Sequence, residues 1–201
     1  MVFKLIKRLS TNNSSYKDHQ ERMKSSVSES VDVDNLSDIS QLVSDLNDQI
    51  ASMLLSSILD NDPSFFEDLV VELLSKMGYK GLNGFSEVTP YTNDGGIDGI
   101  INQDPLGTRT IYLQVKRYAL NNVVQRPDIQ KFHGALNEKN ADRGVFITTS
   151  DFSKGAVDAA ERLGIVLING KKLTSLMIKY SVGVKEKNKF VIYEIDQHYF
   201  E

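Results

Sequence analysis

The sequence predicts an α/β fold with a central mixed β-sheet flanked by helices. The first observation behind this prediction is a change in the spacing of apolar residues, which is helical up to about residue 77 and alternates after residue 97. The second is that a β-hairpin is then followed by helices and strands in alternation. A hairpin pairs its strands antiparallel, whereas strands joined through a helix pair parallel, so one sheet is expected to hold both kinds.

Three segments divide the chain. Residues 1–41 are rich in Ser, Asn and Asp and poor in apolar residues, so we expect a flexible polar segment. Residues 42–60 repeat apolar side chains at helical spacing, which predicts a linker helix. Residues 61–201 form the remaining domain. It opens with a second helix, because Asp62 can cap a helix that Pro63 begins.

The elements expected after this helix follow from alternation, turn residues and apolar stripes. In chain order they are strands 97–101 and 110–116 joined by a turn at 104–107, a helix after Pro127, a strand at 144–149, an alanine-rich helix at 153–163, a strand at 165–168, a turn at 169–170, a helix at 173–180 and a last strand at 190–195.

Composition excludes several classes of protein. The chain has no cysteine, so disulfides and thiolate metal sites are absent. No apolar run approaches the roughly 20 residues that a membrane helix needs. The basic N-terminus is interrupted by lysine, which makes it a poor secretion signal. We therefore expect a soluble cytoplasmic protein without a membrane partner.

The distribution of charge is more informative than the net charge of -4. Residues 109–143 carry an excess of lysine and arginine, although acids predominate earlier in the chain. Basic residues supply most of the affinity for phosphate, so this region is the one expected to face nucleic acid. The alternative is a merely solvated surface.

Asp98 is the first candidate for a catalytic residue. It lies between Ile97 and Gly99, in a short predicted strand where aspartate is unfavourable by propensity. Such a local cost often marks a functional site. The preceding Asp94 is followed by glycine, so it is interpreted as a turn residue in preference to a second acid of the site.

Gln114 and Lys116 are the second part of the candidate site. Residues two apart in a strand point to the same side, so these two side chains share a face. The predicted hairpin brings Asp98 next to Gln114, which places a carboxylate, an amide oxygen and an ammonium together. Hard cations such as magnesium prefer oxygen ligands, and lysine can stabilise charge that develops on phosphorus. The alternative is a surface hairpin with an ordinary polar face.

Several blocks of the chain resemble the Mrr catalytic domain found in type IV restriction endonucleases. The resemblance extends from about Leu46 to the C-terminus, with all blocks in the same order. The blocks are residues 63–79, Asp94-Gly-Gly-Ile-Asp-Gly-Ile-Ile101, Gln114-Val-Lys-Arg-Tyr118, Gly144-Val-Phe-Ile-Thr-Thr-Ser150, Val166-Leu-Ile-Asn-Gly170, residues 176–184 and Tyr193-Glu-Ile-Asp-Gln-His-Tyr-Phe200.

The resemblance implies a restriction-endonuclease-like three-layer fold of the PD-(D/E)XK superfamily, and metal-assisted attack of water on a DNA phosphodiester. It implies that Asp98 and Gln114 bind the metal and that Lys116 is the catalytic lysine. Glu67 matches an acid that approaches the metal through water in related nucleases, and the alternative is a surface glutamate. Because Gln114 replaces a carboxylate, we expect Mg²⁺ or Mn²⁺ to bind weakly until DNA arrives.

Other residues are weaker candidates for binding DNA. Arg117, Arg126 and Lys131 are expected to contact phosphates. Ser150 and Ser153 precede the alanine-rich helix, where hydroxyl and amide groups can bind a phosphate, and ordinary helix capping explains them equally well.

The chain departs from the Mrr pattern at its N-terminus. Members of the family carry a winged-helix domain that recognises DNA, whereas only about 45 polar residues precede the matching region here. The resemblance therefore does not establish whether this chain prefers methylated DNA, and a partner protein could supply recognition. The family acts as oligomers, so a homodimer or homotetramer is expected. The alternatives are a structure-selective nuclease, such as a junction resolvase, and a DNA-binding or interaction module that no longer cuts.

Overall fold

The computed structural model describes residues 29–81, 84–88, 96–141, 143–189, 191–193 and 195–201. The chain divides into two units, one up to Asp48 and one from Gln49 to Glu201. In the first unit the described residues are helical and belong to α2 (Glu29–Asp60). The helix expected over 42–60 thus begins earlier, because apolar residues continue its spacing upstream through Leu36.

The second unit holds the sheet and the remaining helices. Its elements are α3 (Pro63–Lys76), β1 (Phe85–Val88), β2 (Gly99–Asn102), β3 (Thr110–Lys116), α4 (Arg126–Glu138), β4 (Gly144–Thr148), α5 (Lys154–Leu163), β5 (Ile165–Ile168), α6 (Gly170–Lys179) and the 3₁₀ helix η1 (Gln197–Phe200).

The sheet is mixed, as predicted. Its strand order is β1-β2-β3-β4-β5. The pairs β1–β2 and β2–β3 are antiparallel, and the pairs β3–β4 and β4–β5 are parallel. The change occurs at β3, which therefore borders both the hairpin and the parallel half of the sheet.

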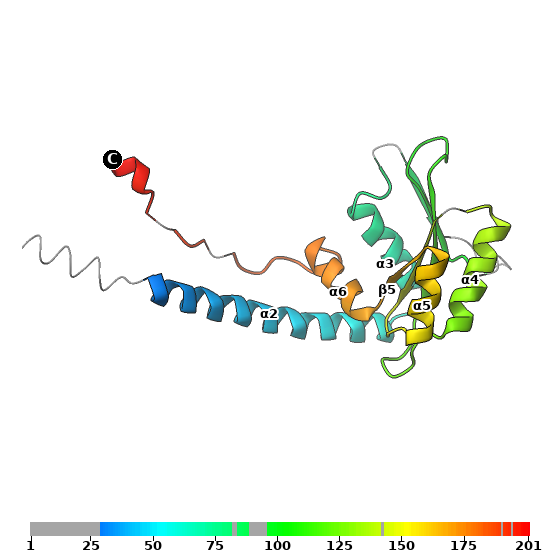
Figure 1. Cartoon of the computed structure of the whole chain (residues 1–201), viewed down its shortest axis with the longest axis horizontal. Coiled ribbons are helices and arrows are strands. Elements are labelled where there is room, and N and C mark those ends of the chain that lie inside the picture. The colour runs from blue at the N-terminus through cyan, green and yellow to red at the C-terminus, as the bar shows by residue number, and fades with distance from the viewer. Residues whose placement is uncertain (1–28, 82–83, 89–95, 142, 190, 194) are drawn as a thin grey trace, which may run out of the picture. The chain divides into compact units, whose positions relative to one another are not determined.

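Helices cover both faces of this sheet and make three layers (Figure 1). On one face the C-terminal end of α2, together with α3 and α6, buries Leu54, Phe66 and Met177 against the strands. On the other face α4 and α5 pack Phe132 and Ala160 against the sheet. Side chains of a strand alternate between the two cores, so β3 contributes to both.

Some boundaries differ from those predicted. β1 was not expected, because it is only four residues long and its two strand formers, Phe85 and Val88, are separated by two polar residues. Gly170 begins α6 instead of forming a turn, since Asn169 caps that helix by accepting from the Lys172 amide at 3.0 Å. The described part of the stretch 190–195 forms no strand. Among the described residues, no helix is long and apolar enough to cross a bilayer.

Candidate active site

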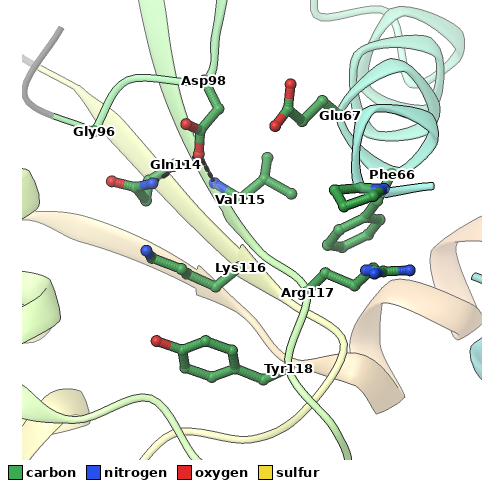
Figure 2. Close-up of a pocket in the computed structure, with 10 residues that line it drawn as sticks. Phe66, Glu67, Gly96, Asp98, Gln114, Val115, Lys116, Arg117 and Tyr118 are labelled. Carbon is green, nitrogen blue, oxygen red and sulfur yellow. Dashed lines mark hydrogen bonds between the residues drawn. The ribbon is translucent and has the colours of Figure 1, made fainter. Parts of the chain in front are cut away.

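A pocket of about 350 Å³ opens beside the C-terminal end of β3, where the first turns of α3 approach the strand (Figure 2). Both elements contribute polar side chains to it. The residues that line the pocket are Pro63, Phe66, Glu67, Gly96, Asp98, Gln114, Val115, Lys116, Arg117 and Tyr118.

Asp98 lies just before β2 and is held against β3. The β2–β3 ladder ends at Gly99, opposite Leu113, and the Asp98 backbone N–H still donates to the Leu113 carbonyl at 2.8 Å. Further along β3, at Val115, the ladder partner is no longer a backbone carbonyl but the Asp98 side chain. Its Oδ2 accepts from the backbone N–H of Val115 at 2.7 Å. A carboxylate thus occupies the place of the next strand partner, so the strand expected over 97–101 begins only at Gly99 and Asp98 lies just outside it.

The Asp98 carboxyl is partly withdrawn from water, and its burial raises its pKa. Three groups oppose this effect, the N–H of Val115, the amide of Gln114 and the positive charge of Lys116. The pKa remains above the ordinary aspartate value, so burial outweighs the three favourable contacts. A positive charge placed at Oδ1 would relieve the cost of keeping this carboxylate ionised.

Gln114 is buried, with 5% of its surface exposed, and its amide faces Asp98. Nε2 donates to Asp98 Oδ2 at 2.7 Å, which leaves Oε1 on the side of Gly96. A Cβ at residue 96 would overlap that oxygen, and the φ of +102° at this position strongly favours glycine. Gly96 is therefore required twice, once for its backbone and once for the space that the amide occupies.

Lys116 and Glu67 complete the polar wall from opposite sides. Lys116 follows Gln114 on the same side of β3, and its charge is close enough to lower the pKa of Asp98. Glu67 projects from α3 toward Asp98 (Figure 2). Burial raises the pKa of Glu67, and the neighbouring charges of Asp98 and Asp68 raise it further. Two acids thus face one space, and a cation bound there would stabilise their ionised forms.

The donor set suits a hard cation better than a softer metal. In the described part of the chain no three His, Cys, Asp or Glu side chains cluster as a ready-made metal site. The pocket instead offers two carboxylates and one amide oxygen. Magnesium commonly binds through one or two carboxylates and keeps several waters or phosphate oxygens, so this set fits such an ion.

Arg117 lines the pocket but is engaged by the protein itself. Its Nη1 donates to the backbone carbonyl of Leu59 at 3.0 Å and also to that of Asn61. These carbonyls belong to the C-terminal end of α2 and the residue that follows, where helical partners are lacking. The guanidinium therefore ties α2 to β3, a structural role that the sequence analysis did not foresee.

The other predicted DNA contacts lie outside the pocket lining. Ser153 caps α5 by accepting from the Ala156 amide at 3.3 Å. Ser150 is buried, and its hydroxyl forms a hydrogen bond with that of Thr148 at 3.1 Å. Arg126 and Lys131 are exposed on α4. The structure thus brings together Asp98, Gln114, Lys116 and Glu67, and leaves the two serines with structural partners.

Tyr118 is a pocket residue that the sequence analysis missed. It continues the two-residue spacing of Gln114 and Lys116 beyond the end of β3, and this spacing would have identified it. Burial raises its pKa, and the charge of Asp128 raises it further, so the phenol keeps its proton. Asp94, weighed as a second acid, lies outside the described residues.

The sheet with helices on both faces and the polar pocket beside it define a restriction-endonuclease-like nuclease fold. Two solved structures share it. MspJI restriction endonuclease in complex with a 27-mer oligonucleotide aligns with a TM-score of 0.54 and 20% identity over 68% of this chain and 32% of that one. The DNA modification-dependent restriction endonuclease AspBHI aligns with a TM-score of 0.50 and 23% identity over 69% and 36%.

Sequence comparison identifies the family within this fold. Residues 58–177 match the Mrr catalytic-domain family, described as a restriction endonuclease. The type IV methyl-directed restriction enzyme EcoKMrr of Escherichia coli (strain K12) is 40% identical over 185 residues, which are 92% of this chain. The chain belongs to the Mrr restriction endonuclease family. It spans 57% of the length of EcoKMrr.

Proposed function

We propose that this chain hydrolyses phosphodiester bonds in DNA as a metal-dependent endonuclease, with the polar pocket as its active site. The observation that carries the proposal is that Asp98, Gln114, Lys116 and Glu67 line one pocket although they come from three separate segments of the chain. Oxygen ligands can hold a metal ion that assists attack on a phosphate, and an ammonium can stabilise the charge that then develops.

Asp98 and Gln114 are the proposed ligands of a Mg²⁺ or Mn²⁺ ion. Bound there, the ion would polarise the phosphate and lower the pKa of a coordinated water. Oδ1 of Asp98 carries neither of the two hydrogen bonds accepted by Oδ2. Gln114 presents its Nε2 to Asp98, so its amide must turn over before Oε1 can act as a ligand. Metal binding therefore competes with an internal hydrogen bond.

Lys116 and Glu67 have different proposed roles in the reaction. The Lys116 ammonium stabilises the negative charge that develops on the phosphate oxygens as water attacks. Glu67 faces the same space from α3, where its carboxylate can accept the proton that an attacking water releases. We therefore place Glu67 beside the attacking water and Lys116 beside the phosphate.

The proposed substrate is duplex DNA, with methylated DNA as the form to test first. EcoKMrr is described as methyl-directed, and this chain matches only part of its length. A partner protein is the proposed source of recognition of the modification. Of the predicted DNA contacts, Arg126 and Lys131 remain proposals because both are exposed on α4.

The organisation that we propose places the catalytic domain in residues 61–201. The linker helix before it is α2, which extends upstream of the expected residues 42–60 to Glu29. The polar segment that we propose before this helix, residues 1–28, lies outside the described residues. Cutting both strands requires two active sites, so we propose that the chain acts in the cytoplasm as a homodimer or homotetramer.

A plasmid-nicking assay tests the proposal. Supercoiled methylated and unmethylated plasmids are incubated with the full chain and Mg²⁺ or Mn²⁺, beside Asp98→Ala and Lys116→Ala. The expected result is cleavage by the wild type and loss of at least about a hundredfold in rate for each variant, as for the removal of one transition-state contact. Matched controls are Asp158→Ala and Lys154→Ala, which remove the same charges from exposed positions of α5 and should leave cleavage unchanged.

Two outcomes contradict the proposal in different ways. Cleavage that survives both pocket substitutions removes the site assignment. Binding of DNA without cleavage in either metal favours the non-cutting module. Branched and single-stranded DNA are included as further substrates, because preference for a junction over duplex would favour the structure-selective nuclease.

A further inference from the structure

Apolar side chains form a heptad stripe along α2. Their spacing alternates strictly between three and four residues, which is the a and d pattern of a coiled coil. The stripe consists of Leu36, Ile39, Val43, Leu46, Ile50 and Met53. Within this helix the stripe covers 18 positions, or about 27 Å of helix axis.

All six side chains of the heptad stripe are exposed, with between 39% and 64% of their surface accessible. The same helix buries a different face at its C-terminal end. Leu54 and Ile58 are 8% and 1% exposed and belong to the core beside α3. Met53 and Leu54 are adjacent and therefore point about 100° apart. Packing of α2 on its own domain thus accounts for Leu54 and Ile58 but leaves the stripe uncovered.

We infer that the heptad stripe is the interface of a parallel two-stranded coiled coil with a second copy of this chain. At the centre of the stripe Val43 and Ile50 at a are β-branched and Leu46 at d lies between them, which is the combination that favours two parallel strands. Leu36 at a and Ile39 at d, at its N-terminal end, do not add to this preference. Burying the exposed half of six apolar side chains on each copy approaches the roughly 1,000 Å² that a specific interface requires.

The charges on α2 are arranged to permit this pairing. The helix contains no basic residue, so acids at positions flanking the seam would repel those of an identical partner. Over the length of the stripe, the e and g positions hold only uncharged residues, such as Ser40, Leu42 and Asn47. Asp38, Asp45 and Asp48 fall at c and f, on the outer face. Because these acids lie away from the seam, they do not select a basic partner over a second copy.

A seam of this length alone would be weak in water, since short isolated helices form poorly. Here the C-terminal end of α2 is already anchored by Leu54, Ile58 and the contact from Arg117 to the Leu59 carbonyl. The helix does not need to nucleate when two copies meet, so less ordering opposes association. This inference rests on the helix alone and holds whether or not the pocket cuts DNA.

Sedimentation of the full chain over a range of concentrations tests the interface. We expect a reversible dimer for the wild type and at least a tenfold weaker dimer for Leu46→Glu, because the substitution buries a charge in the seam. The matched control is Gln41→Glu, which adds the same charge at an outer f position and should leave the dimer intact. Both side chains are exposed in one copy, so neither change should unfold the domain, and thermal melting checks this.

The absence of cysteine allows the orientation to be tested directly. A single Ile39→Cys places a thiol near one end of the seam, where it meets its own counterpart only if the two helices are parallel and in register. We expect mild oxidation to join Ile39→Cys chains into disulfide-linked dimers and to leave Gln41→Cys chains unlinked. A monomer at all concentrations, a dimer unaffected by Leu46→Glu, or a dimer in which Ile39→Cys does not cross-link would each overturn the inference.

Discussion

Substituting Asp98 by asparagine or by alanine should separate the catalytic role of this residue from its structural role. The structural role consists of accepting two hydrogen bonds at Oδ2, each of 2.7 Å, from the Val115 backbone N–H and from Gln114 Nε2. Asparagine keeps an oxygen that can accept them, whereas alanine leaves both donors without an acceptor. If Asp98 binds the metal, both substitutions abolish cleavage.

The expected stabilities follow from the same contacts. A buried donor left without a partner costs about 1–3 kcal/mol. Water can enter the pocket, so we take about 2 kcal/mol for the two donors together in Asp98→Ala. For a chain of this size that loss lowers the melting temperature by about 4–8 °C. Asp98→Asn should melt at or slightly above the wild type at neutral pH, because it removes a carboxylate that burial makes costly to ionise.

The dependence on pH has a definite sign. The pKa of Asp98 is raised in the folded state, so its ionised form destabilises the fold at pH values above that pKa. As the pH falls through the raised pKa, the folded protein takes up the proton first and the cost disappears. The advantage of Asp98→Asn over the wild type should therefore be present at neutral pH and vanish below the ordinary aspartate range.

Thermal melting of the wild type and both variants between neutral and acidic pH measures these differences, with Asp158→Asn and Asp158→Ala as exposed controls. The reasoning is refuted if Asp98→Asn melts as low as Asp98→Ala at neutral pH. That result would mean that the two hydrogen bonds at Oδ2 contribute nothing that an amide oxygen can replace.

Three further predictions concern the surroundings of the pocket. Gly96→Ala should lower the free energy of unfolding by about 1–3 kcal/mol and reduce cleavage, because it combines a strained φ of +102° with an overlap on Gln114 Oε1. Melting and plasmid nicking measure the two effects, and an unchanged protein would contradict the position of that amide. Arg117→Ala should accelerate hydrogen exchange at the end of α2, because the carbonyls of Leu59 and Asn61 lose their donor. Arg126→Ala should not, and equal exchange in both variants would contradict the role of Arg117 in holding α2 to β3. Calorimetry should detect weak Mg²⁺ binding to the wild type without DNA, and tighter binding to Gln114→Glu, which places a second carboxylate beside Asp98. Tight binding to the wild type would contradict the competition between the ion and the hydrogen bond from Gln114 to Asp98.

Most of the fold could be predicted because its determinants are local. Apolar periodicity identified the helices and central strands, and the turn before β3 implied the antiparallel pairing that brings Asp98 beside Gln114. The exceptions lie at edges. β1 is a short edge strand without a strong apolar pattern, and the stretch 190–195 has apolar residues but, in its described part, no strand. Pairing at an edge depends on what the neighbouring strand offers, which is not a local property.

The sequence by itself determined the mixed sheet and the chemistry of the candidate site, because these depend on residue type and spacing. Only the tertiary structure decided how the groups are used. It directed Glu67 from α3 toward Asp98, turned the nitrogen of Gln114 to the carboxylate, and engaged Arg117 with the end of α2. The physical reason is that burial and hydrogen-bond partners arise between segments distant in the chain, and a linear pattern does not specify which donors and acceptors will meet.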